Sequence, residues 1–167
     1  MAMREISPYE LNRNIFNTFA GEWLLLTAGN KKKFNSMTIS WGGMGVVWNK
    51  LVSYIFVRPQ TYTYQFIEDN QYLSICAFNS EYRNALKYCG THSGRDVDKT
   101  KVTGLRAAFD EKAPYYIQAR LVFICRKIYM QDLNEESMLD NKFKEYYKDG
   151  DYHRMYVCEI VKVLVND

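Results

Sequence analysis

Hydrophobic and polar positions alternate along several short segments of the chain, and this period of two is typical of β-strands. Residues 35–41 alternate apolar side chains with Thr38 and Ser40, so that one face is apolar and the other offers hydroxyls. Residues 71–78 have two largely apolar faces, which predicts a buried strand. Further strands are expected over 22–28, 51–57, 105–109 and 155–165, and over a long, bent segment at 115–129.

Helical signals are short and lie between these strands. Ser7-Pro8-Tyr9-Glu10 has the residues of a capping box with proline at the first helical position, and the apolar spacing after it predicts an N-terminal helix over about 8–19. Further helices are expected over 61–68, 80–88 (with Gly90 just beyond its end), 96–103 and 134–148. Strands interrupted by short helices, without regular strand–helix alternation, predict a mainly β fold with short α-helices, an antiparallel barrel.

Three glycines, Gly42, Gly43 and Gly45, follow the strand at 35–41 and leave the backbone there without side chains. Glycine within a strand marks a bulge, a bend or the close approach of another group. The segment therefore has two interpretations. It is either a wall against which a flat ligand lies or only a bend of the chain.

Length and charge exclude several classes of protein. The 167 residues fit one domain, residues 1–167, that is large enough to bury a core. The net charge of +3, from 22 basic and 19 acidic residues, is too nearly balanced to indicate a nucleic-acid or membrane partner. The one charge run, Lys31-Lys32-Lys33, is most simply a solvated hairpin turn, with a phosphate contact as the alternative.

The cysteines and histidines have no spacing that suggests a metal site. The four cysteines include no CxxC pair and the two histidines form no ligand pair, so no metal is predicted. Three of the cysteines lie in apolar, strand-like runs, where a reduced thiol packs as a small hydrophobe. Because the N-terminus also lacks an apolar signal region and no stretch approaches a membrane span, we expect a cytoplasmic protein.

Four motifs occur in order along the chain: NSMTISWGGMG, WNK, VRPQTYTYQFIE and YCGTHSGRDVDK. Together they resemble the signatures of the flavin reductase-like, FMN-binding split-barrel proteins, particularly the flavoredoxin branch. The resemblance runs from about Trp23 to the C-terminus. It implies an antiparallel split β-barrel that binds FMN, and a homodimer with FMN at the subunit interface. The surplus of aromatic residues and the shallow wall of a small barrel also favour a second copy closing over the ligand.

FMN needs cationic and hydroxyl or amide donors for its phosphate, donors for its ring, and an open apolar face. Arg58, where a strand meets a helix N-terminus, suits the phosphate, with a surface ion pair as the alternative. The loop 93–99 adds a glycine and two cations, for which capping and solvation are the alternative. Residue chemistry and resemblance together give these candidate cofactor-binding residues: Asn35, Ser36, Met37, Thr38, Ser40, Trp41, Gly42, Arg58, Gln60, Thr63, Tyr64, Ser93, Gly94, Arg95 and Lys99.

The first functional hypothesis is a flavin reductase, in which bound FMN accepts a hydride from NADH or NADPH and passes electrons to free flavin or an acceptor protein. Its rival is a flavoredoxin-type electron carrier without NAD(P)H oxidase activity. A nucleic-acid-binding barrel is disfavoured by the near-neutral charge. Cys89 and His92 lie close in sequence, but spacing establishes no nucleophile geometry, and hydride transfer to flavin needs none. No catalytic side chain is predicted.

Overall fold

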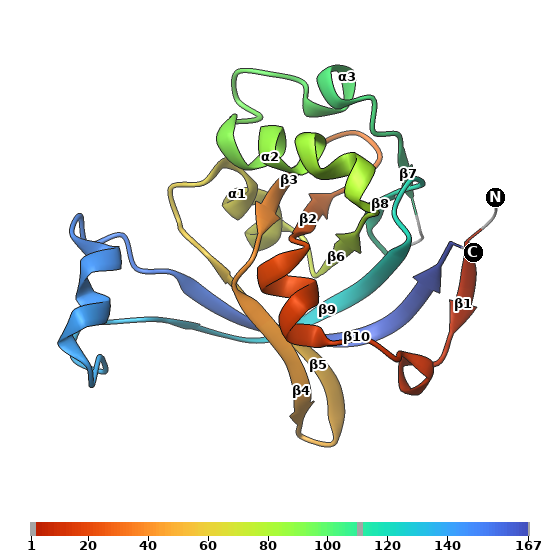
Figure 1. The fold of residues 1–167 in the computed structure, drawn as a ribbon. Helices are drawn as coiled ribbons and strands as arrows, with labels where there is room; N and C mark the ends of the chain where they lie inside the picture. Colours follow the sequence, from red (N-terminus) through yellow and green to blue (C-terminus); the bar gives the residue numbers. More distant parts are fainter. Residues whose placement is uncertain (1–2, 110–111, 167) are drawn as a thin grey trace.

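A computed structural model describes residues 3–109 and 112–166 of the chain (Figure 1). Within them, one antiparallel sheet has eight strands, and β7 and β8 form a separate hairpin. The strands are β1 (Arg4–Ile6), β2 (Leu24–Gly29), β3 (Phe34–Ile39), β4 (Gly42–Val47), β5 (Lys50–Val57), β6 (Tyr72–Ala77), β7 (Ala107–Phe109), β8 (Pro114–Tyr116), β9 (Leu121–Asp132) and β10 (Arg154–Val165).

The strand order of the main sheet is β3-β2-β6-β9-β10-β5-β4, and β1 pairs with the end of β10. The two strands at the ends of this order, β3 and β4, are consecutive in the chain and joined only by Ser40 and Trp41. The three Cα steps from Ile39 to Gly42 span at most roughly 11 Å, so the ends of the sheet must lie close together. The sheet therefore curls into a barrel, which confirms the predicted mainly β, antiparallel class.

The glycine segment is itself a strand, β4, which the sequence did not predict. Trp48 and Asn49 have φ values of 50° and 56°, the left-handed pair that a two-residue hairpin turn requires, and they connect β4 to β5. Gly42 has φ 144°, and a Cβ there would lie 2.4 Å from the carbonyl oxygen of Tyr54. Gly42 therefore lies at the bend between β3 and β4, which we call the joint of the barrel, and this agrees with the interpretation of the glycine segment as a bend.

Both faces of β2 are buried, which explains its continuous apolar run. Leu24 and Leu26 belong to the cluster inside the barrel, with Phe123 and Tyr156. Leu25 faces the opposite side and packs in a second cluster with α2 and β8. The four cysteines are reduced and buried in these two clusters, as the sequence suggested for three of them.

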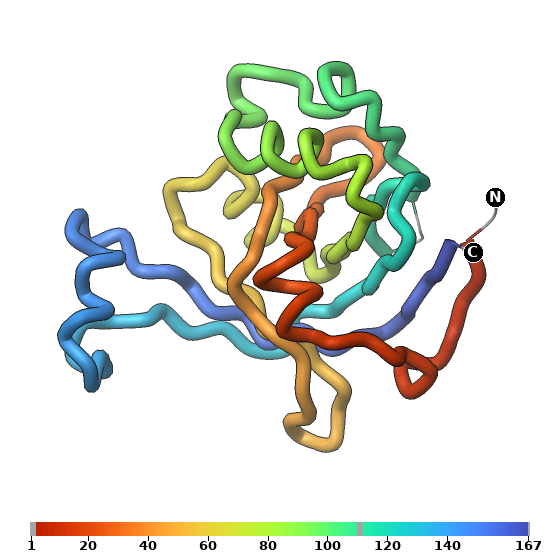
Figure 2. Tube along the Cα trace, in the orientation of Figure 1, coloured from red at the N-terminus to blue at the C-terminus, as the bar shows by residue number. Residues whose placement is uncertain are grey.

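The helices are α1 (Tyr62–Asp69), α2 (Arg83–Thr91) and α3 (Lys99–Thr103), with 3-10 turns at Pro8–Glu10, Ser80–Tyr82 and Asn141–Tyr147 and a π-type turn at Asn17–Gly21. Figure 2 shows α2 and the loop to α3 lying together over one end of the barrel. No described helix is long and apolar enough to span a membrane.

The predicted helix over 8–19 is wrong in extent. The capping box at Ser7 forms, but it begins only a three-residue 3-10 turn. Leu11 then packs against the barrel core from extended backbone, and the side chain of Asn14 accepts a hydrogen bond from the amide of Asn17 to begin a second helical turn. Residues 8–19 thus form two short helical turns, capped by Ser7 and Asn14, and the core contact of Leu11 separates them. Tertiary packing here overrides the local helical spacing.

Several other boundaries differ from the predictions, and the helix expected over 96–103, for example, begins only at Lys99. Gly90 lies inside α2, where the missing Cβ would stand 3.2 Å from the Cβ of Thr38, so it permits close helix–strand packing and does not end the helix. The expected strand 115–129 is divided into β8 and β9 by a turn in which Ala119 donates to the Tyr116 carbonyl. Within 134–148 only residues 141–147 are helical, and they are of the 3-10 type.

Two parts of the chain project from the barrel in Figure 1. One is the β4–β5 hairpin. The other, which we call the arm, comprises residues 128–156, with the end of β9, the beginning of β10 and the 3-10 turn at its tip. Both carry exposed aromatic side chains, including Trp48 on the hairpin, and Tyr129, Phe143 and Tyr146 on the arm.

Candidate functional site

Two adjoining cavities open where the loop 92–98 and the start of α1 meet β3. The first, which we call the β3 groove, has a volume of about 270 Å³. Nine of the fifteen candidate residues line it: Asn35, Met37, Thr38, Gln60, Thr63, Ser93, Gly94, Arg95 and Lys99. Segments that are distant in sequence, from three of the four motifs, thus meet in one groove.

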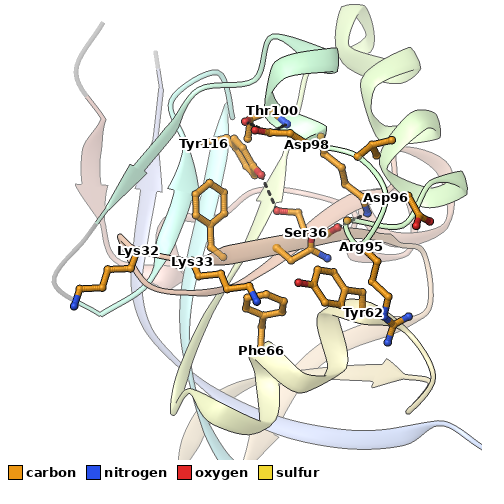
Figure 3. Close-up of a pocket in the computed structure, with 15 residues that line it drawn as sticks. Lys32, Lys33, Ser36, Tyr62, Phe66, Arg95, Asp96, Asp98, Thr100 and Tyr116 are labelled. Atoms are coloured by element: carbon orange, nitrogen blue, oxygen red, sulfur yellow. Dashed lines mark hydrogen bonds between the residues drawn. The ribbon is translucent and has the colours of Figure 1, made fainter.

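The second cavity, which we call the Lys33 pocket, has a volume of about 480 Å³ and lies beside the groove (Figure 3). The two share a wall made of Asn35, Tyr62, Gly94, Arg95 and Lys99. Ser36, another candidate, lines only this second cavity. Its buried hydroxyl lies 2.8 Å from that of Thr27 and 2.7 Å from that of Tyr116, so it is engaged with the protein.

Asn35 fixes the geometry of the shared wall. Its buried side-chain amide donates to the hydroxyl of Thr63 at 2.9 Å, which ties β3 to the first turn of α1. Gly94 lies against the other side of Asn35, and a Cβ there would stand 2.0 Å from Asn35 Oδ1. Only glycine lets the loop approach Asn35 this closely.

The N-terminus of α1 faces the β3 groove without a side-chain cap. The hydroxyl of Thr61, the N-cap residue, donates to the carbonyl of Arg58 at 2.8 Å and accepts no hydrogen bond from the first-turn amides. The first amides of a helix have no intrahelical acceptor and carry the positive end of its dipole. The amide of Tyr64 donates to the carbonyl of Thr61 at 3.1 Å, so the first-turn donors left for an anion are the amides of Tyr62 and Thr63.

Arg95 is the cation beside these amides. Its exposed guanidinium lies over the ring of Tyr62, 5.0 Å from the centroid, and makes one long hydrogen bond of 3.4 Å to the carbonyl of Gln60. No carboxylate in the described ranges 3–109 and 112–166 pairs with it. Its charge thus remains unneutralised at the boundary of the two cavities.

Lys99 has a structural role that its sequence context did not reveal. Its ammonium is buried and donates to the carbonyls of Ser36 at 2.7 Å and Cys89 at 2.8 Å, so it links α3 to β3 and α2. Burial lowers the pKa of Lys99 and raises that of Cys89. The helix cap next to it is Asp98, whose carboxylate accepts from the amides of Thr100 and Lys101.

Arg58 lies beside the groove and forms the ion pair that the sequence analysis named as its alternative role. Its guanidinium pairs with Asp151 of the arm, donates to the carbonyl of Tyr146 at 3.0 Å and lies over the ring of Tyr147. Gln60 donates to the same carboxylate at 2.6 Å. Hydrogen bonds from Arg58 lower the pKa of Asp151. A phosphate contact for Arg58 stays a prediction.

The remaining candidates lie outside both cavities. Trp41 packs edge-on against Tyr146 of the arm at 5.2 Å, and Ser40 lines a small neighbouring cavity beside α2. Gly42 lies at the joint of the barrel, as described above. Tyr64 is on the other side of α1, where its ring lies under the guanidinium of Arg154.

Several residues that build the site were not predicted. Tyr62 lines both cavities. Its spacing of four residues from Phe66 places the two rings on one face of α1, and this spacing could have indicated that Tyr62 belongs to the site. Tyr116 lines the second cavity, as does Lys33, for which the sequence analysis had named a phosphate contact only as the alternative to a solvated turn. Asp151 had no local signal, because 93 residues separate it from Arg58.

The comparisons with known proteins identify the family and the fold. The sequence model of the flavin reductase like domain matches residues 16–167. The chain belongs to this family. The flavin reductase-like chain has no match among curated proteins.

Solved structures show the same fold at low sequence identity. Flavoredoxin from Methanosarcina acetivorans is 22% identical, with a TM-score of 0.71 over 97% of this chain and 77% of its own. An FMN-binding protein from Thermus thermophilus is 15% identical, with a TM-score of 0.70 over 99% and 83%. An NADH:FAD oxidoreductase from Streptomyces globisporus is 14% identical, with a TM-score of 0.65 over 87% and 74%. The fold is thus the split barrel of the flavin reductase-like proteins, as expected from the motifs.

Proposed function

We propose that this flavin reductase-like protein binds FMN in the β3 groove and transfers a hydride to it from NADH or NADPH, for delivery to free flavin or an acceptor protein. The observation that carries the proposal is the meeting, in one groove, of the uncapped α1 N-terminus, the unpaired guanidinium of Arg95 and the polar backbone of β3. Family membership and the flavin-binding neighbours support it.

The donors in the groove fit the parts of FMN. The α1 amides, Arg95 and the hydroxyls of Thr63 and Ser93 suit the phosphate and the polar chain next to it. The backbone of β3 at Met37 and Thr38 suits the polar edge of a flat ring, and the thioether of Met37 gives it an apolar contact. When bound, FMN supplies the hydride-accepting ring.

The protein's own residues orient the ligand and position the loop around it. Lys99 holds α2 and α3 against β3 through its two carbonyl acceptors, and Asn35 holds the first turn of α1. Gly90 allows α2 to approach Thr38, which closes one side of the groove. A groove built on a strand and two helix ends is well suited to fix a ring in one orientation.

The second candidate is an electron carrier that receives electrons from a partner protein. It is supported by the flavoredoxins from Methanosarcina acetivorans and Desulfovibrio vulgaris among the structural neighbours. Both functions use the same groove. They differ in whether the purified, flavin-loaded protein oxidises NADH or NADPH at a steady rate with free flavin as acceptor.

A homodimer that completes the groove is part of the proposal. The groove's volume of about 270 Å³ is below the roughly 300–1,000 Å³ typical of small-molecule sites, so one chain encloses little of a flavin. The projecting hairpin and arm expose large apolar side chains, with Trp48 61% exposed and lying 5.8 Å from the ring of Tyr129. Exposed aromatic patches of this kind mark protein interfaces.

Sedimentation of the flavin-bound protein tests the dimer and should give twice the 19.7 kDa chain mass. Trp48→Lys should give monomers and release flavin in parallel, because the second chain no longer closes over the ligand. The hairpin contributes no residue to either cavity of one chain, so a loss of flavin would not come from a direct contact of Trp48 within that chain. A monomer that holds flavin tightly at every concentration contradicts the shared site but leaves flavin binding untouched.

Flavin binding itself is tested by the visible spectrum of the purified protein and by titration with FMN and riboflavin. We expect FMN to bind more tightly than riboflavin. Arg95→Gln should weaken FMN by about 1.5–3 kcal/mol, the scale of a hydrogen bond to a charged group, with a smaller effect on riboflavin. Arg106→Gln, at an exposed arginine outside both cavities, is the matched control. Equal affinities for the two flavins in the unaltered protein contradict the phosphate site.

A further inference from the structure

A third cavity lies between the start of α2, the turn before β2 and the turn before β9. Its volume of about 640 Å³ exceeds that of the β3 groove and of the Lys33 pocket, and is in the range of small-molecule sites. None of its lining residues lines either of those two cavities. We call it the Arg120 cavity, and its lining includes Glu22, Phe78, Asn79, Arg83, Leu86 and Arg120.

Arginine side chains dominate the charge around this cavity. Arg120, which lines it, and Arg13, which does not, both pair with the carboxylate of Glu22. Arg83 forms no ion pair within residues 3–109 and 112–166. Its guanidinium is held 3.2 Å above the centre of the Trp23 ring and donates to the main-chain carbonyl of Glu22 at 2.9 Å. Three guanidinium groups therefore gather around Glu22, whose carboxylate neutralises the charge of only one.

Two hydrogen-bond donors of this cluster are left without acceptors. The Nε atoms of Arg13 and Arg120 are buried and have no partner among the residues that the structure describes. Buried donors of native proteins are nearly always bonded, so each unbonded one indicates a missing acceptor. Burial and the neighbouring charge of Arg13 also lower the pKa of Arg120. An anion in the cavity would balance the excess charge and accept hydrogen bonds from the guanidinium of Arg120.

The rest of the lining favours an organic acid over an inorganic anion. Phe78 and Leu86 are buried, and they give the cavity an apolar surface next to the arginines. Glu81 also lines the cavity, but it is exposed, so that solvent screens its charge. The planar fork of an arginine matches a carboxylate, and an apolar group attached to that carboxylate is stabilised by leaving water.

We propose that the Arg120 cavity binds a small organic acid. Its carboxylate contacts the guanidinium groups of Arg83 and Arg120, and its apolar part packs against Phe78 and Leu86. The proposal does not depend on the proposed function, because the cavity shares no residue with the groove assigned to the flavin.

Calorimetric titration of the purified protein with benzoate, its neutral analogue benzamide and inorganic phosphate tests the proposal. We expect benzoate to bind about tenfold more tightly than benzamide or phosphate, because only benzoate has both the charge and the apolar ring. Arg83→Gln should weaken benzoate about tenfold and leave benzamide unchanged. Arg106→Gln, at an exposed arginine outside all three cavities, is the matched control and should leave benzoate unchanged.

A second variant covers a failure of Arg83→Gln to fold. Arg120→Lys keeps the positive charge beside Glu22 but loses the planar fork, so it should also weaken benzoate about tenfold. Urea unfolding of each variant shows whether it is folded.

Four results would overturn the proposal. The first is equal affinity of the unaltered protein for benzoate and benzamide, and the second is benzoate binding that the folded arginine variants leave unchanged. The third is phosphate binding as tight as that of benzoate, since the ligand then needs no apolar part. The fourth is loss of benzoate binding on saturation with FMN, which would place benzoate in the β3 groove.

Discussion

Protonation of His153 is expected to destabilise the protein in mildly acidic solution. The ring is buried at the base of the arm, packed against Trp41 at 5.3 Å, and its Nδ1 lies 2.8 Å from the hydroxyl of Tyr147. Burial, assisted by the positive charge of Arg58, lowers the pKa of His153 from 6.5 to about 4. The neutral ring is therefore the form that the fold accommodates.

The sign and size of the effect follow from linkage. Between the two pKa values the unfolded chain binds a proton that the folded chain does not, so stability falls as the pH drops from 6.5 towards 4. At pH 5 the loss relative to pH 7 is about 2 kcal/mol. Paired carboxylates such as Asp132 and Asp151, whose pKa values are lowered by Arg154 and Arg58, lose their contribution only as the pH falls below their ordinary value of 3.8. The histidine effect thus has its own pH window.

Urea unfolding followed by tryptophan fluorescence at pH 7 and pH 5 measures the effect. His153→Gln keeps a neutral hydrogen-bonding side chain and should lose about 2 kcal/mol less than the unaltered protein over this interval. His92→Gln alters the other of the two histidines, which is exposed, and should follow the unaltered protein. If His153→Gln loses as much stability as the unaltered protein, the buried neutral histidine is not the cause and the reasoning fails.

Three further substitutions test the site. Gly94→Ala should lower FMN affinity without unfolding the protein, because its Cβ would lie 2.0 Å from the side-chain amide oxygen of Asn35 on β3. Gly43→Ala is the control and should leave FMN affinity unchanged, because its Cβ would have no atom within 4 Å. Lys99→Met should reduce the free energy of unfolding in urea by about 1–3 kcal/mol, and Lys101→Met, at an exposed lysine, by much less. Equal losses in the two variants would contradict a stabilising role for the hydrogen bonds from Lys99 to Ser36 and Cys89. Arg58→Ala should weaken FMN by about 1.5–3 kcal/mol and riboflavin much less; equal losses in the two titrations assign Arg58 to the fold through its pair with the arm.

The sequence determined most of the buried strands, though not β4, and many of the residue types of the site, because these depend on local pattern. Alternation located the buried strands, and β6 differs from its predicted bounds of 71–78 by only one residue at each end. The motifs indicated the family. They also included Gly94, although as a candidate cofactor contact and not as the residue that packs against Asn35. In each case neighbouring residues in the sequence carried the whole signal.

The tertiary structure decided which residues meet and which charges remain unpaired. Lys99 and Arg95 are four residues apart in one polar loop, yet one is buried against two carbonyls and the other is exposed beside an uncapped helix. Arg58 has the local context of a phosphate ligand, but a carboxylate 93 residues away pairs with it. Neither difference is visible in the sequence, because desolvation and ion pairing depend on atoms that the fold brings together from distant segments.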